Sequence, residues 1–394
     1  MPWYETDPMK ERTQFILEAT SGLRSFSEVC QRFGISRETG YKWLQRYDAA
    51  GPDGLHDRSH RPHSCPHATD PEILEAAFEL RRRRPRWGAA KIHTRLATLY
   101  PHWDLPCPRV LHKHLLRAGL VRKKRRVRTH PHPGRPTAPF TAPNSIWSAD
   151  YKGHFKTRDG RYCYPLTLQD GFSRFLLACQ AVDGTTYHAA RLVFTRLFRE
   201  FGIPDRIRTD NGPPFSSPLA LGRLSRLAVW WIRLGILPDF IEPASPQQNG
   251  RHERMHKDLK ADACIPPAGN RSAQQRRFNS LLHDFNHIRP HEALQMKTPA
   301  DVYVPSTRPF PNKLPPLNYP AHFEVRKVST NGGIRWHSCW VNASHLLGGE
   351  LVGLEEIADG VWAVFFGPLC LGWLHIDKGA IISDDGSSSR NPRL

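Results

Sequence analysis

The stretch from Trp147 to Lys260 constrains the chain most, because it places three acidic residues in three different local settings. Asp150 lies in the middle of SIWSADYKGHF, a run rich in aromatic and β-branched residues that predicts a β-strand. Asp210 ends the segment that starts at Ile203 and precedes Asn-Gly-Pro-Pro, a series of turn residues. We therefore expect Asp210 at the carboxyl end of a second strand, where ligand sites of open sheets tend to lie.

The third acid, Glu253, follows Pro246 and Gly250 and enters a segment of good helix formers that extends to Ala261. A helix here places four polar residues on one face, at spacings of three, four and seven. These residues are Glu253, His256, Lys257 and Lys260. We expect the acid to bind a metal ion and the neighbouring bases to bind phosphate.

Three carboxylates without a cysteine among them favour Mg²⁺ or Mn²⁺ over Zn²⁺. Magnesium usually takes only a few carboxylates and fills its remaining positions with water and substrate phosphate. Two such ions roughly 4 Å apart can bracket a phosphodiester and assist both the attacking and the leaving oxygen. If folding brings the three acids together, they predict metal-dependent phosphoryl transfer.

The phrases around these acids, WSADYKG, LQDGFSRF, RTDNGPPF and SPQQNGRHERMHKDL, resemble the integrase catalytic core of insertion-sequence transposases and retroviral integrases. That DDE family has an RNase H-like α/β fold. The resemblance implies that Asp150, Asp210 and Glu253 are the catalytic and metal-binding residues, holding two Mg²⁺ (or Mn²⁺) ions per active site. The 42 residues between the last two acids exceed the interval in most of the family. We attribute the excess to a long helix over 219–237.

Each acid taken alone has a simpler interpretation. An aspartate before Asn-Gly is usually a turn residue, which applies to Asp210. Glu253 and Lys257 could form an ordinary helical ion pair of about 0.3–0.5 kcal/mol, and Asp150 could be a solvated strand acid. A fourth acid, Asp170 in Asp-Gly-Phe-Ser, is better explained as a turn residue whose carboxylate accepts backbone N–H groups.

The composition points to a nucleic acid partner. The 394 residues carry a formal net charge of +19 and a pI near 9.9, a trait shared with cationic secreted or membrane-surface proteins. No run of 18 apolar residues predicts a membrane span, and the amino-terminal MPWYETDPMKER does not resemble a signal peptide. The eight cysteines are scattered, which favours reduced thiols in a cytoplasmic, nucleoid-associated bacterial protein.

Residues 1–50 have the pattern of a helix-turn-helix domain. The periodicity predicts helices over 9–20 and 27–33, and a third from the N-cap Ser36 to Tyr47. We expect Tyr41 and Leu44 to pack inward on that third helix. Four polar residues then remain for the DNA major groove: Arg37, Lys42, Gln45 and Arg46. The alternative is a plain three-helix bundle with a solvated basic face, but GISRETGYKWLQRY closely resembles the amino-terminal domain of the same transposases.

Two linkers flank a second helical unit. Residues 51–70 are rich in Pro, His and Arg and could follow a minor groove. A zinc site there, from His60, His63, Cys65 and His67, lacks the usual paired spacing. Residues 71–121 predict three helices and resemble the second, winged-type DNA-binding domain of these transposases; a packing or dimer domain is the alternative. Residues 122–139 form a basic, Pro-rich tether, expected to follow phosphates. Its basic residues are Arg122, Lys123, Lys124, Arg125, Arg126 and Arg128.

The predicted catalytic core spans residues 140–304. Strands are expected over 145–155, 162–169, 175–182, 204–210 and 239–243, with a helix over 186–201 between the third and fourth. Helices at Glu253 and over 276–288 close the domain. Further DNA contacts are expected from Asn249, Arg251, Arg254, Lys257 and Lys260.

The remaining chain predicts a small β domain. A Pro-rich linker at 305–320 precedes five short apolar segments within 321–383, which suit an SH3-like barrel. Residues 384–394 are expected to be disordered. The chain is thus interpreted as a multidomain α+β protein with two DNA-binding modules before an integrase core.

These observations predict a DNA transposase that acts on double-stranded DNA as a homodimer or higher oligomer. It would cleave the ends of an insertion sequence to free 3′-hydroxyls and join them to target DNA. One alternative is a DNA-binding regulator with an inactive core, and another is an RNase H-like metal nuclease without strand transfer. Metal-dependent joining of DNA ends distinguishes the transposase from both.

Overall fold

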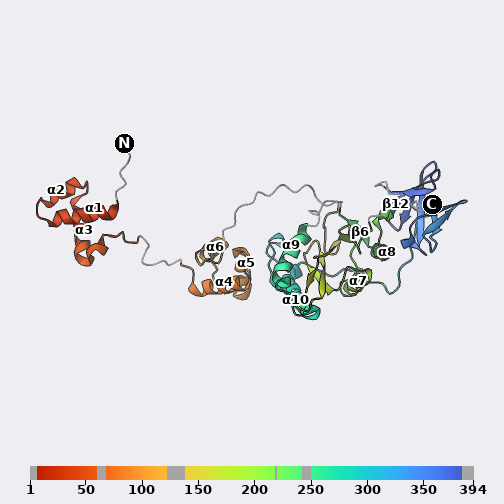
Figure 1. Cartoon of the computed structure of the whole chain (residues 1–394), viewed down its shortest axis with the longest axis horizontal. Helices are drawn as coiled ribbons and strands as arrows, with labels where there is room; N and C mark the ends of the chain where they lie inside the picture. Colours follow the sequence, from red (N-terminus) through yellow and green to blue (C-terminus); the bar gives the residue numbers. More distant parts are fainter. Residues whose placement is uncertain (1–6, 60–67, 122–137, 218–219, 242–249, 384–394) are drawn as a thin grey trace. The chain divides into compact units, whose positions relative to one another are not determined.

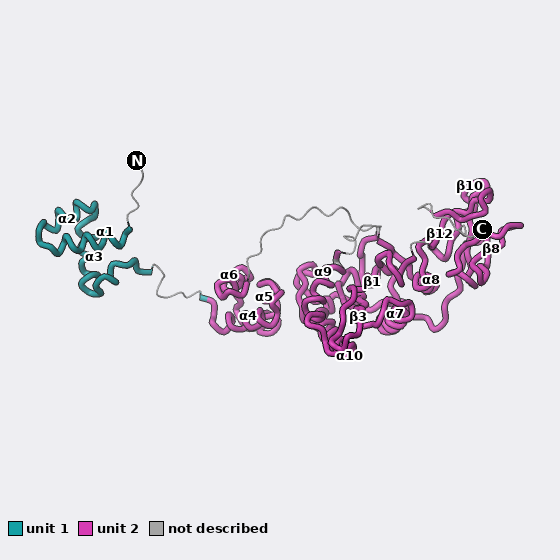
Figure 2. The backbone as a smooth tube through the Cα atoms, in the orientation of Figure 1, with its two compact units in different colours: residues 1–68 teal, residues 69–394 magenta. Residues whose placement is uncertain are grey.

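The computed structural model describes residues 7–59, 68–121, 138–217, 220–241 and 250–383. The chain divides into two compact units, residues 1–68 and 69–394 (Figure 2). No described helix is long and apolar enough to cross a membrane. None of the seven cysteines in the described parts of the chain forms a disulfide.

The first unit is the three-helix domain that the sequence predicts. It consists of α1 (Pro8–Thr20), α2 (Phe26–Arg32), α3 (Arg37–Ala50) and the short 3₁₀ helix η1 (Gly51–Leu55). Ser25 and Glu28 form a capping box on α2, and the Ser36 hydroxyl accepts the Thr39 N–H at the start of α3. The fully buried Leu55 packs into this domain, so the domain extends beyond its expected end at residue 50.

The prediction that Tyr41 of α3 packs inward is wrong. Tyr41 is 58% exposed and stacks on the ring of Phe26. Gly40 faces the core instead, where an added Cβ would lie 2.7 Å from the Cys30 sulfur. The buried stripe of α3 therefore begins at a residue without a side chain and continues through Trp43, Leu44 and Tyr47.

Three further helices form the segment predicted over residues 71–121: α4 (Pro71–Arg83), α5 (Ala89–Leu99) and α6 (Pro108–Arg117) (Figure 1). The Asp70 carboxylate caps α4, and Ile92, Leu96, Leu111 and Leu115 pack in the centre. Residues 68–121 contain no strand, so a wing does not lie within this range.

The core sheet runs in the order β4-β3-β1-β5-β6, with the short β2 pairing with β3. Its strands are β1 (Ile146–Tyr151), β2 (Phe155–Lys156), β3 (Tyr162–Asp170), β4 (Leu176–Val182), β5 (Arg206–Thr209) and β6 (Leu237–Phe240). The first strands form an antiparallel meander, and β5 and β6 run parallel to β1. This arrangement is the RNase H-like core that the sequence predicts.

Helices cover both faces of this sheet. On one face, α7 (Tyr187–Phe201) and α8 (Arg226–Arg233) bury Phe194, Phe198 and Trp231 against Trp147 of β1. The other face carries α9 (Gly250–Leu259), η4 (Lys260–Cys264), α10 (Arg271–His283) and η5 (Asp284–Ile288). There, Met255 and Leu259 of α9 pack with Phe278 and with Cys163 and Cys179 of the sheet.

The long helix expected over 219–237 is wrong. Among the described residues of this range, only the 3₁₀ turn η2 (Leu221–Arg223) and the eight residues of α8 are helical. Helix α8 is apolar on two sides: Trp230 and Trp231 join the sheet core, whereas Ala228, Val229 and Ile232 join the core of the carboxyl-terminal domain. The residues between Asp210 and Glu253 thus include a platform for that domain.

The carboxyl-terminal domain is all β, as predicted, with seven strands in place of five. A five-stranded sheet runs in the order β13-β12-β11-β10-β7, and β8 and β9 form a separate hairpin. The strands are β7 (Glu324–Lys327), β8 (Gly333–Trp336), β9 (Cys339–Asn342), β10 (Leu351–Ala358), β11 (Val361–Phe366), β12 (Leu369–His375) and β13 (Ala380–Ile382).

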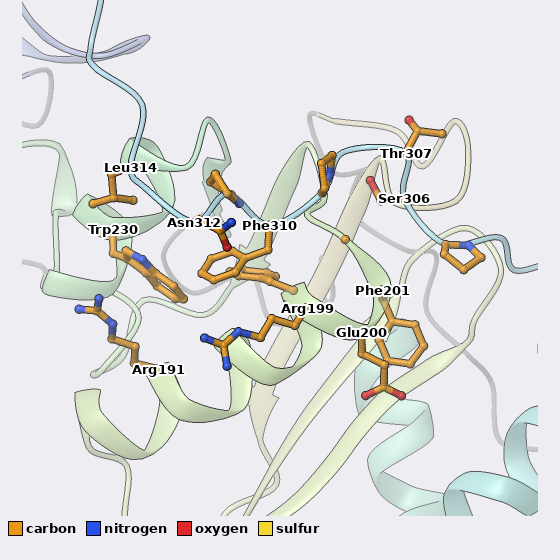
Figure 3. Close-up of a pocket in the computed structure, with 15 residues that line it drawn as sticks. Arg191, Arg199, Glu200, Phe201, Trp230, Ser306, Thr307, Phe310, Asn312 and Leu314 are labelled. Carbon is orange, nitrogen blue, oxygen red and sulfur yellow. The ribbon is translucent and has the colours of Figure 1, made fainter.

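The segment 305–314, expected as a loose linker, is fixed to the core. Arg308 donates to Pro204 O, Asp205 Oδ1 and Gly235 O at 2.8–3.0 Å. Phe310 packs on Trp230 and Phe198 beside α7 (Figure 3). These contacts explain how a Pro-rich segment without regular secondary structure is held in place.

Candidate active site

Asp150 lies near the end of β1, the central strand, opposite Thr167 of β3. Its side chain is 20% exposed. Burial is the main cause that raises its pKa to about 7, the charge of Asp210 adds to this, and that of Glu253 contributes less. The charges of the other two predicted acids therefore both reach Asp150.

Asp210 follows β5 directly. Because β1 and β5 are parallel neighbours, Asp150 and Asp210 lie at the same edge of the sheet. The Asp210 carboxylate accepts the Gly212 N–H at 3.4 Å, and burial raises its pKa. A Cβ on Gly212 would come within 3.2 Å of this carboxylate, so the Asn-Gly pair provides the space that the acid needs.

Glu253 lies in the first turn of α9 and is exposed, as are Arg254, Lys257 and Lys260 on the same helix. These four residues are therefore accessible from solvent. Asn249 and the basic residues from Arg122 to Arg126 lie outside the described residues, as do the four residues of the alternative zinc site. For Arg251 only the helical backbone is described.

The prediction that His256 lies on the same face of α9 as Glu253 is wrong. His256 is 6% exposed and His252 is fully buried, and both point with Met255 and Leu259 into the fold. Positions 252, 255, 256 and 259 have the spacing of one helical face, a pattern that identifies the buried side of α9 from sequence. The prediction missed this buried side because it rested on the charged residues alone.

Both histidines contact the buried hydroxyl of Thr167. The distances from Thr167 Oγ1 to His252 Nε2 and to His256 Nε2 are both 2.7 Å. Burial lowers the pKa of His252 to about 3 and that of His256 to about 2. The approach of His256 Nδ1 to Asp150 Oδ2 at 3.6 Å is therefore not a salt bridge, because the imidazole is neutral.

Two other acids of the core sheet have structural roles. The Asp170 carboxylate accepts the backbone N–H groups of Asn144 and Ser173 at 2.7 Å, which confirms its prediction as a turn residue. Asp239 accepts two bonds, at 2.9 and 2.7 Å, from the buried guanidinium of Arg208. Neither carboxylate is free to serve as an alternative metal ligand.

The predicted DNA-reading side of α3 is accessible. Arg37, Lys42 and Gln45 are exposed, whereas Arg46 is half-buried beside the ring of Trp43. Tyr41, which we expected to pack in the core, is exposed on the same surface.

Comparisons with known proteins agree with this architecture. Two models of an integrase core domain match residues 141–246 and 234–299. A helix-turn-helix domain model matches residues 11–63, and a homeodomain-like domain model matches residues 39–115.

Two insertion-element proteins are similar over most of their length. The chain is 27% identical over 251 residues to the uncharacterized 31.7 kDa protein of insertion element IS407 from Burkholderia multivorans, covering 58% of this chain and 80% of that protein. It is 26% identical over 279 residues to the uncharacterized 39.2 kDa protein of IS476 from Xanthomonas euvesicatoria, covering 68% and 75%.

Among solved structures, the magnesium complex of the HTLV-2 integrase catalytic core is 19% identical, with a TM-score of 0.33. The match covers 41% of this chain and 98% of that one. The sequence matches are more informative, because integrase core and helix-turn-helix models occupy the parts of the chain where the two corresponding structural units lie. Together they show that this chain contains an integrase core domain and helix-turn-helix domains, and that it is similar to proteins of bacterial insertion elements.

Proposed function

We propose that this protein is a DNA transposase that binds the ends of its insertion sequence, cleaves them to free 3′-hydroxyls and joins these to target DNA. One observation carries the proposal: Asp150 and Asp210 end neighbouring parallel strands, and the charges of Asp210 and Glu253 both act on Asp150. A buried acid with two acidic neighbours is a typical arrangement for binding a cation.

The donor set fits a hard divalent ion such as Mg²⁺ or Mn²⁺, and the integrase core family uses divalent metals. Asp150, Asp210 and Glu253 supply only carboxylate oxygens, which suit these ions. The negative charge of Asp210 opposes ionisation of Asp150, and a positive charge held between them would reverse that effect. When bound, two such ions would stabilise the attacking and leaving oxygens of a phosphodiester.

The side chains around the acids would position the DNA. Arg254, Lys257 and Lys260 are exposed on the helix that carries Glu253, so they can bind backbone phosphates near the scissile bond. In the first unit, α3 offers Arg37, Lys42 and Gln45 for base and phosphate contacts in a major groove. Since two element ends must be joined in one reaction, we expect at least a dimer on DNA.

The test is cleavage and joining of a duplex that carries the element's own end, in Mg²⁺ or in EDTA. The variant Glu253→Gln keeps the size of the side chain and removes its charge. Glu200→Gln, an exposed acid on α7, is the matched control. We expect EDTA and Glu253→Gln to abolish cleavage while DNA binding is retained, and the control to behave as wild type.

Other outcomes identify the alternatives. Cleavage that survives Glu253→Gln would remove Glu253 from the metal site. Cleavage without joining indicates a metal nuclease. Specific binding by the wild type without any cleavage indicates a regulator with an inactive core.

A further inference from the structure

His252 and His256 lie one turn apart on the buried face of α9, opposite Asp150 of β1. Each of the three residues offers a ligand atom, and these atoms all lie within 4.8 Å of one another. The segment His252–His256 also has the sequence H-E-x-x-H, in which two histidines on one helical face can bind a metal. That pattern is weak evidence by itself, so the hydrogen bonds around the histidines decide its meaning.

Thr167 fixes which nitrogen of each imidazole carries the proton. Its hydroxyl lies 2.9 Å from Asp150 O and 2.7 Å from both Nε2 atoms, yet it has one proton to donate. All three contacts are hydrogen bonds only if Thr167 donates to Asp150 O and accepts an N–H from each imidazole. Both Nδ1 atoms then carry free lone pairs.

Among the described residues, no hydrogen-bond donor reaches these lone pairs. His252 Nδ1 is buried without a partner. His256 Nδ1 lies 3.6 Å from Asp150 Oδ2, beyond hydrogen-bond length. Two ligands bound to one ion at about 2.1 Å in tetrahedral geometry are about 3.4 Å apart. A buried acceptor without a donor is costly, and a cation would satisfy it.

We propose that Asp150, His252 and His256 form a second kind of metal site, which takes a borderline divalent ion such as Zn²⁺ in preference to Mg²⁺. Imidazole nitrogen suits zinc, whereas magnesium prefers oxygen ligands throughout. Three protein ligands leave a fourth position for water or another small ligand. Thr167 orients both imidazoles through their Nε2–H groups, the usual role of a hydrogen-bond partner behind a metal ligand.

The site shares Asp150 with the proposed catalytic acids, but its existence does not depend on the proposed function. A carboxylate committed to Zn²⁺ would be less available to Mg²⁺. Binding is therefore measured without DNA, so that failure of this site and failure of the transposase proposal give different results.

The experiment titrates the untagged, metal-free full chain with Co²⁺, a spectroscopic substitute for Zn²⁺. We expect one tight site with the visible absorption of four-coordinate Co²⁺, which Zn²⁺ abolishes and excess Mg²⁺ leaves in place. His252→Ala and His256→Ala should each remove this signal. Thr167→Val should weaken binding by about 10- to 100-fold.

The matched control is the double variant His283→Ala/His287→Ala. These histidines are also four residues apart, but both are exposed, so the variant should keep the tight site. Asp150→Asn removes the third ligand with little change in volume and covers the case in which His252→Ala does not fold. X-ray absorption of the wild-type zinc complex should show two imidazole ligands.

Two results would overturn the site. One is a tight Co²⁺ spectrum that persists in folded His252→Ala and His256→Ala. The other is a wild type that shows no four-coordinate Co²⁺ band, in which case the histidines serve only to pack α9 against Thr167.

Discussion

Replacing Asp150 with asparagine should stabilise the metal-free protein while it abolishes catalysis. The pKa of Asp150 is raised from 3.8 to about 7, first by burial and then by the charge of Asp210. Between these two values the folded state holds a proton that the unfolded state has lost. Stability therefore falls as the pH rises from about 4 to about 7, and the full cost applies above 7.

The size of this destabilisation follows from the difference between the two pKa values of Asp150, 3.8 and about 7. At 1.36 kcal/mol per pKa unit, ionised Asp150 costs about 4 kcal/mol at pH 8. Asparagine removes the charge but remains a buried polar group, so we expect a net gain of about 2 kcal/mol. For a domain of this size, that gain raises Tm by about 4–8 °C.

The assay is thermal unfolding in EDTA at pH 8 and pH 5, followed by near-ultraviolet circular dichroism. The advantage of Asp150→Asn should fall below half its pH 8 value at pH 5, because wild-type Asp150 is then protonated in the folded state. Added Mg²⁺ should stabilise the wild type more than the variant.

Asp239→Asn is the matched control. Asp239 neutralises the buried Arg208, so this substitution leaves an unpaired charge and should destabilise by about 3–5 kcal/mol. The same chemical change thus has opposite signs at two aspartates of one sheet. A loss of stability in Asp150→Asn at pH 8, or a gain that is the same at both pH values, would refute the reasoning.

Four further predictions concern other parts of the fold. Gly40→Ala should destabilise the first unit by about 1–3 kcal/mol, measured by chemical unfolding, because its Cβ would clash with Cys30. Lys42→Ala should weaken DNA binding and reduce the slope of its salt dependence by about one, measured by fluorescence anisotropy. Ile232→Ala should destabilise the junction between α8 and the carboxyl-terminal domain by about 2–5 kcal/mol, measured by hydrogen exchange. Zn²⁺ added with Mg²⁺ should inhibit cleavage by the wild type more than cleavage by His256→Ala.

The sequence predicted the elements of the core well, because its strands and helices alternate between apolar runs and turn residues. Thr186 caps α7, as is typical of the start of a helix, and α7 begins where it was expected. Helix α10 instead begins at Arg271, after its cap Asn270, five residues before the expected start at 276. The RNase H-like fold of the core came from the resemblance carried by the phrases around the acids, since local patterns do not specify which strands pair.

The errors share a physical cause, which is that a residue's neighbours in space were unknown. Gly40 has no side chain to mark the buried face of α3, so Tyr41 was assigned to it. Trp230 and Ile232 serve two different cores, so the short α8 resembled part of a longer helix. Arg308 holds a Pro-rich segment through backbone carbonyl groups, which leave no trace in sequence.

Helix α9 shows why the candidate site could be predicted only in part. Its exposed side carries Glu253, which the resemblance identified, whereas its buried side carries the two histidines, which periodicity alone would have revealed. Both sides converge on Asp150, whose backbone is fixed by pairing with Thr167. Because the Thr167 hydroxyl also orients both imidazoles, one buried threonine links the position of the acid to the protonation of the histidines. We therefore expect a substitution at Thr167 to change which metal ion binds even where the protein remains folded. If the histidines served only to pack α9 against Thr167, the substitution would change stability alone.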